Sequence, residues 1–186
     1  MLDFLRYYGR FMYRGAYDLI TYFRRNGRHK LARQALVGEL VWFALVLAGA
    51  VVSWRATLVV LVVPLVVIRF LMMAGNWGQH AFVCQNDPGS SYKSSITCIN
   101  HRYNQRCFND GYHISHHLSA ARHWTEHPAE LRDNVEKYAA NEAVVFKDID
   151  FLGVWFHLMT KNYAGLADKF VDFRDEPRSK EEIIAF

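Results

Sequence analysis

The chain has 186 residues, a net charge of +4 and only three cysteines, and 52% of its residues are hydrophobic. This length suits about one domain. An odd cysteine count without a Cys-x-x-Cys pair argues against a disulfide scaffold, and the first apolar run begins too late for a signal peptide. The basic residues adjoin no nucleic-acid-binding motif, so we expect no nucleic-acid partner.

Residues 1–34 combine aromatic and basic side chains. The stretch 4–23 mixes eight aromatic residues with Arg6, Arg10 and Arg14, and a run of basic residues follows between 24 and 33. This composition is typical of a segment that lies in the membrane interface. We interpret residues 1–34 as an interfacial and juxtamembrane segment.

Two apolar runs follow, at 35–53 and 57–73. Each approaches the roughly 20 residues that a helix needs to cross a bilayer. Their charges, Glu39 and Arg69, lie near the ends of the runs, where a side chain reaches the headgroups at modest cost. We predict two transmembrane helices joined by a tight turn at 54–56; the alternative is a pair of buried helices in a soluble protein.

The basic run before the first apolar segment sets the orientation of this hairpin. The positive-inside rule places that side in the cytoplasm, and two spans return the chain to the same side. Residues 74–186 then form a cytoplasmic cap. The predicted fold class is all-α: an integral membrane protein with a transmembrane helical hairpin followed by a helical cap.

Within the cap, three segments differ in composition. Residues 84–109 carry Asp-Pro-Gly, Ser-Ser and scattered Asn and predict a loop with short irregular pieces. Residues 110–118 predict a helix capped by Asp110. From Pro128 onward the pattern is helical, and Ile149, Leu152, Phe156 and Met159 share a face for docking on the core or the bilayer. We expect the charged tail 172–180 to be frayed.

Three histidines, His113, His116 and His117, occupy relative positions 0, 3 and 4. On a helix these offsets place the three imidazoles on one face, one turn apart. Asn76 and His80, just after the apolar runs, share a helix face in the same way. Imidazole suits zinc, copper, nickel and iron, so the pattern predicts a metal site beside the membrane without choosing the metal.

The order of these motifs resembles the C-terminal half of a membrane fatty acid desaturase: apolar hairpin, Asn-x-x-x-His, polar loop, then Gly-Tyr-His-x-x-His-His. Related membrane hydroxylases share the pattern. The resemblance spans residues 35–163 and implies a two-iron centre in a cytoplasmic cap. It implies that His80, His113, His116 and His117 are iron ligands and that Asn76 reaches a metal through water.

The resemblance is incomplete in one respect. Desaturases carry two further histidine boxes upstream of this hairpin, whereas residues before Ala35 include only His29. Four histidines and one asparagine cannot fill the coordination of two irons that each want about four or five ligands. The chain therefore encodes half a site, which leaves three readings: a fragment of a longer enzyme, a subunit completed by a second chain, or a non-catalytic relative.

The other ionisable residues near the triplet have lesser expected roles. Asp110 and Glu126 are the carboxylates nearest to the histidines, and His123 and His127 form an i, i+4 pair. These four are candidates for orienting the imidazoles. We expect His101 to be a loop residue, His29 to face the headgroups, and His157 to be a hydrogen-bonded core residue.

The resemblance also implies a function and its partners. It implies oxygen-dependent insertion of a double bond into a fatty acyl chain, with hydroxylation as the alternative outcome and an inactive isolated chain. No haem, dinucleotide or iron–sulfur motif supplies electrons, so the resemblance implies a separate donor such as cytochrome b5 or a ferredoxin. Lys93, Arg102 and Arg106 are candidates for its docking patch. The expected location is the endoplasmic reticulum or bacterial inner membrane, as a multi-pass protein whose histidines face the cytoplasm.

Overall fold

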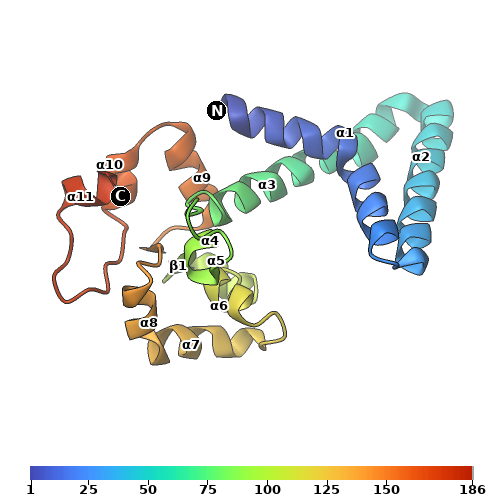
Figure 1. Cartoon of the computed structure of the whole chain (residues 1–186). Helices are drawn as coiled ribbons and strands as arrows, with labels where there is room; N and C mark the ends of the chain where they lie inside the picture. The colour runs from blue at the N-terminus through green and yellow to red at the C-terminus, as the bar shows by residue number, and fades with distance from the viewer. Residues whose placement is uncertain (186) are drawn as a thin grey trace. The chain divides into compact units, whose positions relative to one another are not determined.

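The structure, a computed structural model, describes residues 1–185 and is mostly helical (Figure 1). It divides into two compact units, Met1–Met73 and Ala74–Phe186. We describe each unit by itself.

The N-terminal unit consists of long helices. Its elements are α1 (Leu2–Arg25), α2 (His29–Thr57), the π-helical turn η1 (Leu58–Val62) and the first part of α3 (Val63–Gln79). The interfacial segment predicted at 4–23 is thus one helix. It packs through Phe4, which is 1% exposed, and Tyr8, both of which meet the ring of Phe70 edge-on.

The helical path from His29 onward is interrupted at Ser53. This residue has an extended backbone (φ −157°, ψ 97°), and its Oγ accepts a hydrogen bond from the N–H of Ala56 (3.4 Å). That is the geometry of an N-cap, so Ser53 starts a new helix. The turn predicted at 54–56 is wrong in this detail, because those three residues are helical and a single residue makes the break.

The two helices approach each other closely beside this break. A Cβ added to Gly49 would lie 2.7 Å from Oγ1 of Thr57, so only glycine allows this contact. The hydroxyl of Thr57 in turn donates to the carbonyl of Ser53 (3.0 Å). A small residue and a satisfied hydroxyl therefore hold the corner.

The helical run His29–Gln79 is, among the described residues, the one helical segment long and apolar enough to cross a membrane. Only 11% of its most apolar window is buried, and Val51 and Val52 are 81% and 88% exposed. A soluble protein would bury such a surface. Insertion into a bilayer and the two-span topology stay predictions.

The C-terminal unit has a small parallel sheet that the all-α prediction missed. Strands β1 (Thr97–Ile99) and β2 (Val145–Lys147) pair with Thr97 opposite Val145. Helices surround them: α4 (Ser91–Ser94), α5 (Arg102–Arg106), α6 (His113–Leu118), α7 (His127–Asp133), α8 (Val135–Ala140), α9 (Phe151–Met159), α10 (Tyr163–Ala167) and α11 (Lys180–Ala185), with a 3₁₀ turn, η2 (Trp124–Glu126). Three-residue strands leave too short an alternation to be read from sequence.

The sheet separates two hydrophobic clusters. Cys98 and Phe146 belong to the cluster that also contains Phe151 and Val154 of α9. Val145, one residue away, belongs to the cluster that contains Ile114 of α6. Successive strand residues point to opposite faces, so this short ribbon anchors α6 on one side and α9 on the other.

The apolar face that was predicted to dock on the core or the bilayer lies only partly in the core. Ile149 is buried at 6% exposure, whereas Leu152 and Phe156 are 40% and 60% exposed. Within α9 the buried residues are Phe151 and Val154. Asp150 caps the helix by accepting from the N–H of Gly153, and this fixes the register. The helix is apolar on both sides, so spacing alone did not select the buried face.

The tail predicted to be frayed is instead tied together by Asp172. Its carboxylate accepts from the guanidinium of Arg174 and from the backbone N–H groups of Arg174 and Arg178. These bonds hold the pKa of Asp172 well below its ordinary value. The charged residues thus pair with one another and lead into α11.

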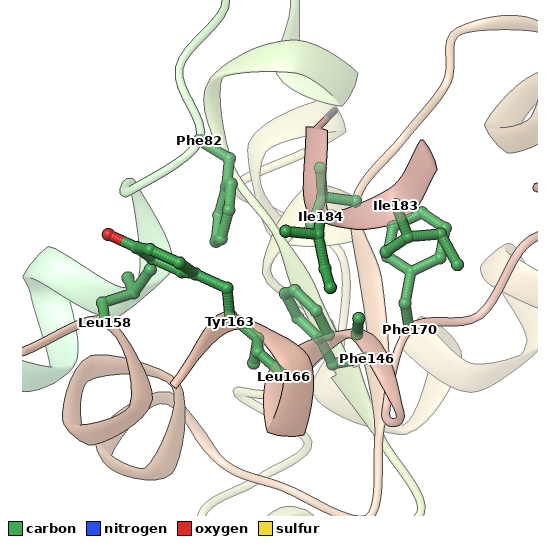
Figure 2. Close-up of a pocket in the computed structure, with 10 residues that line it drawn as sticks. Phe82, Phe146, Leu158, Tyr163, Leu166, Phe170, Ile183 and Ile184 are labelled. Atoms are coloured by element: carbon green, nitrogen blue, oxygen red, sulfur yellow. The ribbon is translucent and has the colours of Figure 1, made fainter. Parts of the chain in front are cut away.

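An apolar pocket of about 200 Å³ lies beneath α11 (Figure 2). Ile183 and Ile184 of α11 point toward the rings of Phe146 and Phe170. The lining contains no histidine, cysteine or carboxylate, so it offers no chemistry of its own.

Candidate metal centre

Helix α6 is placed by the turn that precedes it. The backbone of Gly111 makes two hydrogen bonds: its N–H donates to Oδ1 of Asn104, and the Gly111 carbonyl accepts from the N–H of Cys98. Nδ2 of Asn104 in turn donates to the carbonyl of Cys98. A Cβ at Gly111 would lie 2.1 Å from Oδ1 of Asn104, so only glycine fits. The Asp-Gly-Tyr-His segment therefore docks the start of α6 against the end of β1.

Three histidine nitrogens converge at the start of α6. Nε2 of His113 lies 3.3 Å from Nε2 of His80 and 3.2 Å from Nε2 of His117. Each of the three residues offers one ligand atom, and these atoms all lie within 4.8 Å of one another. The i, i+4 spacing of His113 and His117 puts two of them on one face of the helix, and His80 comes from the end of α3.

The tautomer of His80 follows from its other nitrogen. Nδ1 lies 2.8 Å from the carbonyl oxygen of Ser94, which can only accept, so Nδ1 carries the proton and donates. Nε2 therefore presents a lone pair to the other two rings. A carbonyl that fixes the ring in this way is the usual support of a metal-binding histidine.

His113 is held in its neutral form. The ring is 8% exposed, and burial, reinforced by the neighbouring histidines His117, His80 and His116, lowers the pKa of His113 to about 3. Burial likewise lowers the pKa of His117. A neutral imidazole is the form that binds a metal, so the environment prepares these rings as ligands.

The donor set fits a transition-metal ion. Two imidazole nitrogens that each lie about 2.1 Å from one ion, at roughly 90–110° to each other, are about 3.0–3.4 Å apart. The two short contacts at His113 fall in this range. The other ring nitrogen of His113, Nδ1, is buried and, unlike Nδ1 of His80, has no hydrogen-bond partner in the part of the chain described.

The structure does not bring all five predicted ligands to one point. His116 is exposed and stacks on the ring of His113 at 5.7 Å, but it lies outside the group of three. It lines an open cleft of about 690 Å³ on another side of α6. Asn76 lies one turn before His80, and its carbonyl accepts the N–H of His80 (3.2 Å). Metal binding by any of the five stays a prediction.

Of the four residues expected to orient the imidazoles, none bonds to a ring of the converging group. Asp110 does not cap α6, which begins at His113. Its carboxylate accepts instead from the hydroxyl of Tyr103 (2.7 Å) and from Gln79 (3.3 Å), next to His80. Glu126 is exposed, and His123 is exposed with its Nδ1 on the hydroxyl of Thr125.

His127 contacts the side chain of Ser115, on the helix that carries His113 and His117. It is 6% exposed, and its Nδ1 lies 2.9 Å from Oγ of Ser115, which is itself fully buried between the metal-binding candidates. Arg122 donates to both the carbonyl (2.9 Å) and Oγ (2.7 Å) of Ser115. Burial, followed by the nearby Arg122, lowers the pKa of His127.

Sequence reasoning missed this buried network. Arg122 also approaches Glu130 (3.9 Å), whose carboxylate accepts from the hydroxyl of Tyr138 (2.7 Å). The network ties α6 to α7 and to Arg122 through Ser115. A serine inside a histidine triplet was the available signal, since a polar residue on the inward face of a short helix needs partners.

The remaining histidines lie outside the group. His101 accepts the N–H of Tyr103 and caps α5, and His157 donates to the carbonyl of Asn162 (3.2 Å). His29 is the exposed first residue of α2. The three cysteines are free.

The fold and site together define a helical protein with an exposed apolar helical run and a three-histidine, metal-compatible cluster. A family model described as fatty acid desaturase matches residues 1–148, and the chain belongs to that family. Members of the family are generally iron-dependent and membrane-associated. Comparison with curated proteins and with solved structures gave no match.

Proposed function

We propose that this chain supplies iron ligands to an oxygen-dependent desaturase that introduces a double bond into an aliphatic acyl chain. The convergence of Nε2 of His80 (3.3 Å) and Nε2 of His117 (3.2 Å) on Nε2 of His113 carries the proposal. Family membership supports a desaturase-like function in general. Iron bound at these nitrogens would supply the redox chemistry that breaks an unactivated C–H bond, which no acid or base side chain can do.

The residues of the chain prepare that chemistry in three ways. The carbonyl of Ser94 orients His80, and burial keeps His113 neutral. The ring of Phe151 packs against His113 at 5.8 Å and keeps water away from it. Excluding water protects reactive species from side reactions and strengthens local electrostatics.

A two-iron centre needs more ligands than the converging group provides. Three nitrogens fill most of one coordination sphere, and two irons want about four or five ligands each. His116 faces another side of α6 and is available to a second ion. We propose that the remaining ligands come from outside these 186 residues, either from the same longer polypeptide or from a second chain.

The surroundings of the site complete the proposal. The exposed apolar surface of α2 and α3 supports insertion as a two-span hairpin, with the basic run before it facing the cytoplasm. An acidic electron carrier, such as cytochrome b5 or a ferredoxin, would meet exposed Arg102 and Arg106 on α5. Lys93 is less available, because it lies 3.9 Å from Asp87.

Metal binding is the direct test. The full chain, purified in detergent and stripped of metal, is titrated anaerobically with Fe(II), and bound iron is measured by elemental analysis. We expect His80→Ala and His117→Ala to lose iron and His29→Ala, a surface control, to retain it. Equal iron in all four proteins would overturn the proposal.

A second measurement distinguishes the desaturase hypothesis from the hypothesis of a non-catalytic relative. An antibody to this segment reports the mass of the polypeptide in membranes of the source cell. A product well above 21.7 kDa supports ligands within one longer chain. Lipid analysis of cells with and without the protein then distinguishes a double bond from an alcohol. A 21.7 kDa product with unchanged lipids would favour a non-catalytic relative that binds one metal or none.

A further inference from the structure

A cavity of about 520 Å³ lies within the N-terminal unit, among α1, α2 and the start of α3. Its lining is mostly aromatic and aliphatic, with Tyr7, Phe11 and Tyr22 among the contributors. Gly15 and Ala16 leave α1 without bulky side chains at this point. The cavity also contains charged side chains of both signs, which is unusual beside so apolar a helical run.

Most of the charges on α1 are paired with each other. Asp18 lies 3.3 Å from the guanidinium of Arg14 and 4.0 Å from that of Arg10. These contacts are local to one helix and account for the one acidic residue that α1 contributes to the cavity. They leave two charges of opposite sign on the other helices.

Glu39 of α2 and Arg69 of α3 are those two charges, and both are half-buried. The guanidinium of Arg69 lies over the ring of Phe11 at 5.5 Å. Within residues 1–185, no carboxylate lies within ion-pairing distance of Arg69, and no cation does so for Glu39. A half-buried charge costs free energy unless it finds a partner. The cavity therefore presents one acceptor and one donor that do not satisfy each other.

We propose that this cavity binds the headgroup of a zwitterionic phospholipid. The phosphate would lie at Arg69 and the ammonium at Glu39. An aromatic lining suits the ammonium, because a cation is attracted to the face of a ring. A purely anionic headgroup would leave Glu39 unpaired and repel it, and an uncharged lipid would leave both charges unpaired.

The inference goes beyond the proposed function, since the site shares no residue with the histidine cluster. It rests on the membrane insertion proposed above. Glu39 and Arg69 lie near the outer ends of the two apolar runs, where a bilayer would present its headgroups. Lipid at this position would link α1 to the hairpin through both helices.

Native mass spectrometry of the full chain tests the proposal. The protein is released from micelles doped in turn with dioleoylphosphatidylethanolamine, dioleoylphosphatidylglycerol or dioleoylglycerol. We expect the wild-type chain to retain the ethanolamine lipid best. Arg69→Gln should lower retention of both phospholipids by about tenfold. Glu39→Gln should lower retention of the ethanolamine lipid alone. Arg33→Gln and Glu136→Gln, which lie outside the cavity, are the matched controls.

Four outcomes overturn the proposal. Retention of the ethanolamine lipid that is unchanged in both variants excludes a headgroup site. Preference for the glycerol phospholipid identifies an anion site, and equal retention of dioleoylglycerol identifies binding by acyl chains only. If both variants unfold and the charge-swapped Glu39→Arg/Arg69→Glu chain regains the wild-type Tm, the two residues pair with each other instead.

Failure of the proposed function gives a different result. A chain that does not partition into membranes refutes the insertion on which this inference rests. Loss of the iron site, by contrast, leaves lipid retention unchanged, and bound iron measured in the same preparations separates the two cases.

Discussion

The two units of this protein differ in where they place their apolar side chains. In residues 1–73 only Phe4, Ala32, Thr57 and Met73 are buried, and the apolar side chains of α2 and α3 point outward. In the C-terminal unit, side chains such as Ile114, Val145 and Val154 are fully buried in two clusters around the sheet. The first unit leaves most of its apolar side chains on its surface, whereas the second buries them in a core of its own.

This difference explains why the histidine cluster lies in the C-terminal unit. Neutral, oriented imidazoles need fixed neighbours, and only the C-terminal unit has a core rigid enough to supply them. The N-terminal unit contributes a surface and a cavity instead. The predictions below test this contrast, beginning with the largest expected effect.

The largest effect should come from the core of the C-terminal unit. Phe146 is 3% exposed and packs between the rings of Phe82 and Phe170. Phe146→Ala should lower the free energy of unfolding by about 3–5 kcal/mol, because it removes a buried ring and leaves a cavity. Chemical denaturation of the full chain in detergent measures the change. Phe156→Ala, at a site that is 60% exposed, is the control and should change little. Equal losses of unfolding free energy in the two variants would mean that Phe146 does not belong to a stabilising core.

The next effect should come from a charge in the apolar run of the N-terminal unit. Leu45→Lys places an ammonium at a site that is 57% exposed, midway along the first apolar run, 35–53. In a bilayer it should cost about 2.5–3.5 kcal/mol and reduce membrane integration. Alkali extraction of membranes, followed by quantification of the pelleted protein, measures integration. Leu36→Lys, beside the basic run, should integrate normally because its side chain reaches the headgroups. If Leu45→Lys pellets like the wild type, these helices do not meet lipid.

Lower pH should destabilise the metal-free chain through its buried imidazoles. The folded-state pKa of His113 is about 3, against 6.5 for an unperturbed histidine. Between these values the unfolded state binds the proton and the folded state does not, so stability falls as the pH falls below 6.5. The loss between pH 6.5 and 5 should reach about 2 kcal/mol. Denaturation at the two pH values should show a smaller difference for His113→Ala and a wild-type difference for His29→Ala. A pH dependence that survives in His113→Ala would assign the effect to other groups.

Much of this contrast can be predicted from the sequence, because it depends on local patterns. Long apolar runs and the i, i+4 offset of His113 and His117 need no tertiary information. The convergence of His80 with them is a tertiary fact, and only the family resemblance pointed to it. The offset also placed His116 with the group, but its ring stacks on that of His113 with the centroids 5.7 Å apart, and His116 is not one of the three residues whose ligand atoms converge.

The errors have physical causes of the same kind. Asp110 has the chemistry of an N-cap, but the turn at Gly111 directs its carboxylate to Tyr103 and Gln79. The paired strands are three residues long, and their register is set by helices that pack on both faces. Ser53 was within reach of sequence reasoning, because serine at a helix start is a common cap. An apolar run hid that signal.

The smallest predicted effect tests whether the core of the C-terminal unit holds the metal centre in place. Ser115 is fully buried and joins His127 and Arg122 to the helix that carries His113 and His117. Ser115→Ala should cost about 1–2 kcal/mol, because Arg122 and the buried ring of His127 each lose a hydrogen-bond partner. It should also weaken Fe(II) binding several-fold, since outer groups that orient ligands affect metal affinity. Ser119→Ala, just past the end of α6, should change neither quantity. Stability and affinity come from denaturation and anaerobic titration of the same preparations. If Ser115→Ala loses stability but keeps full affinity, the network serves the fold alone, and the histidines are positioned by the turn at Gly111 and the carbonyl of Ser94.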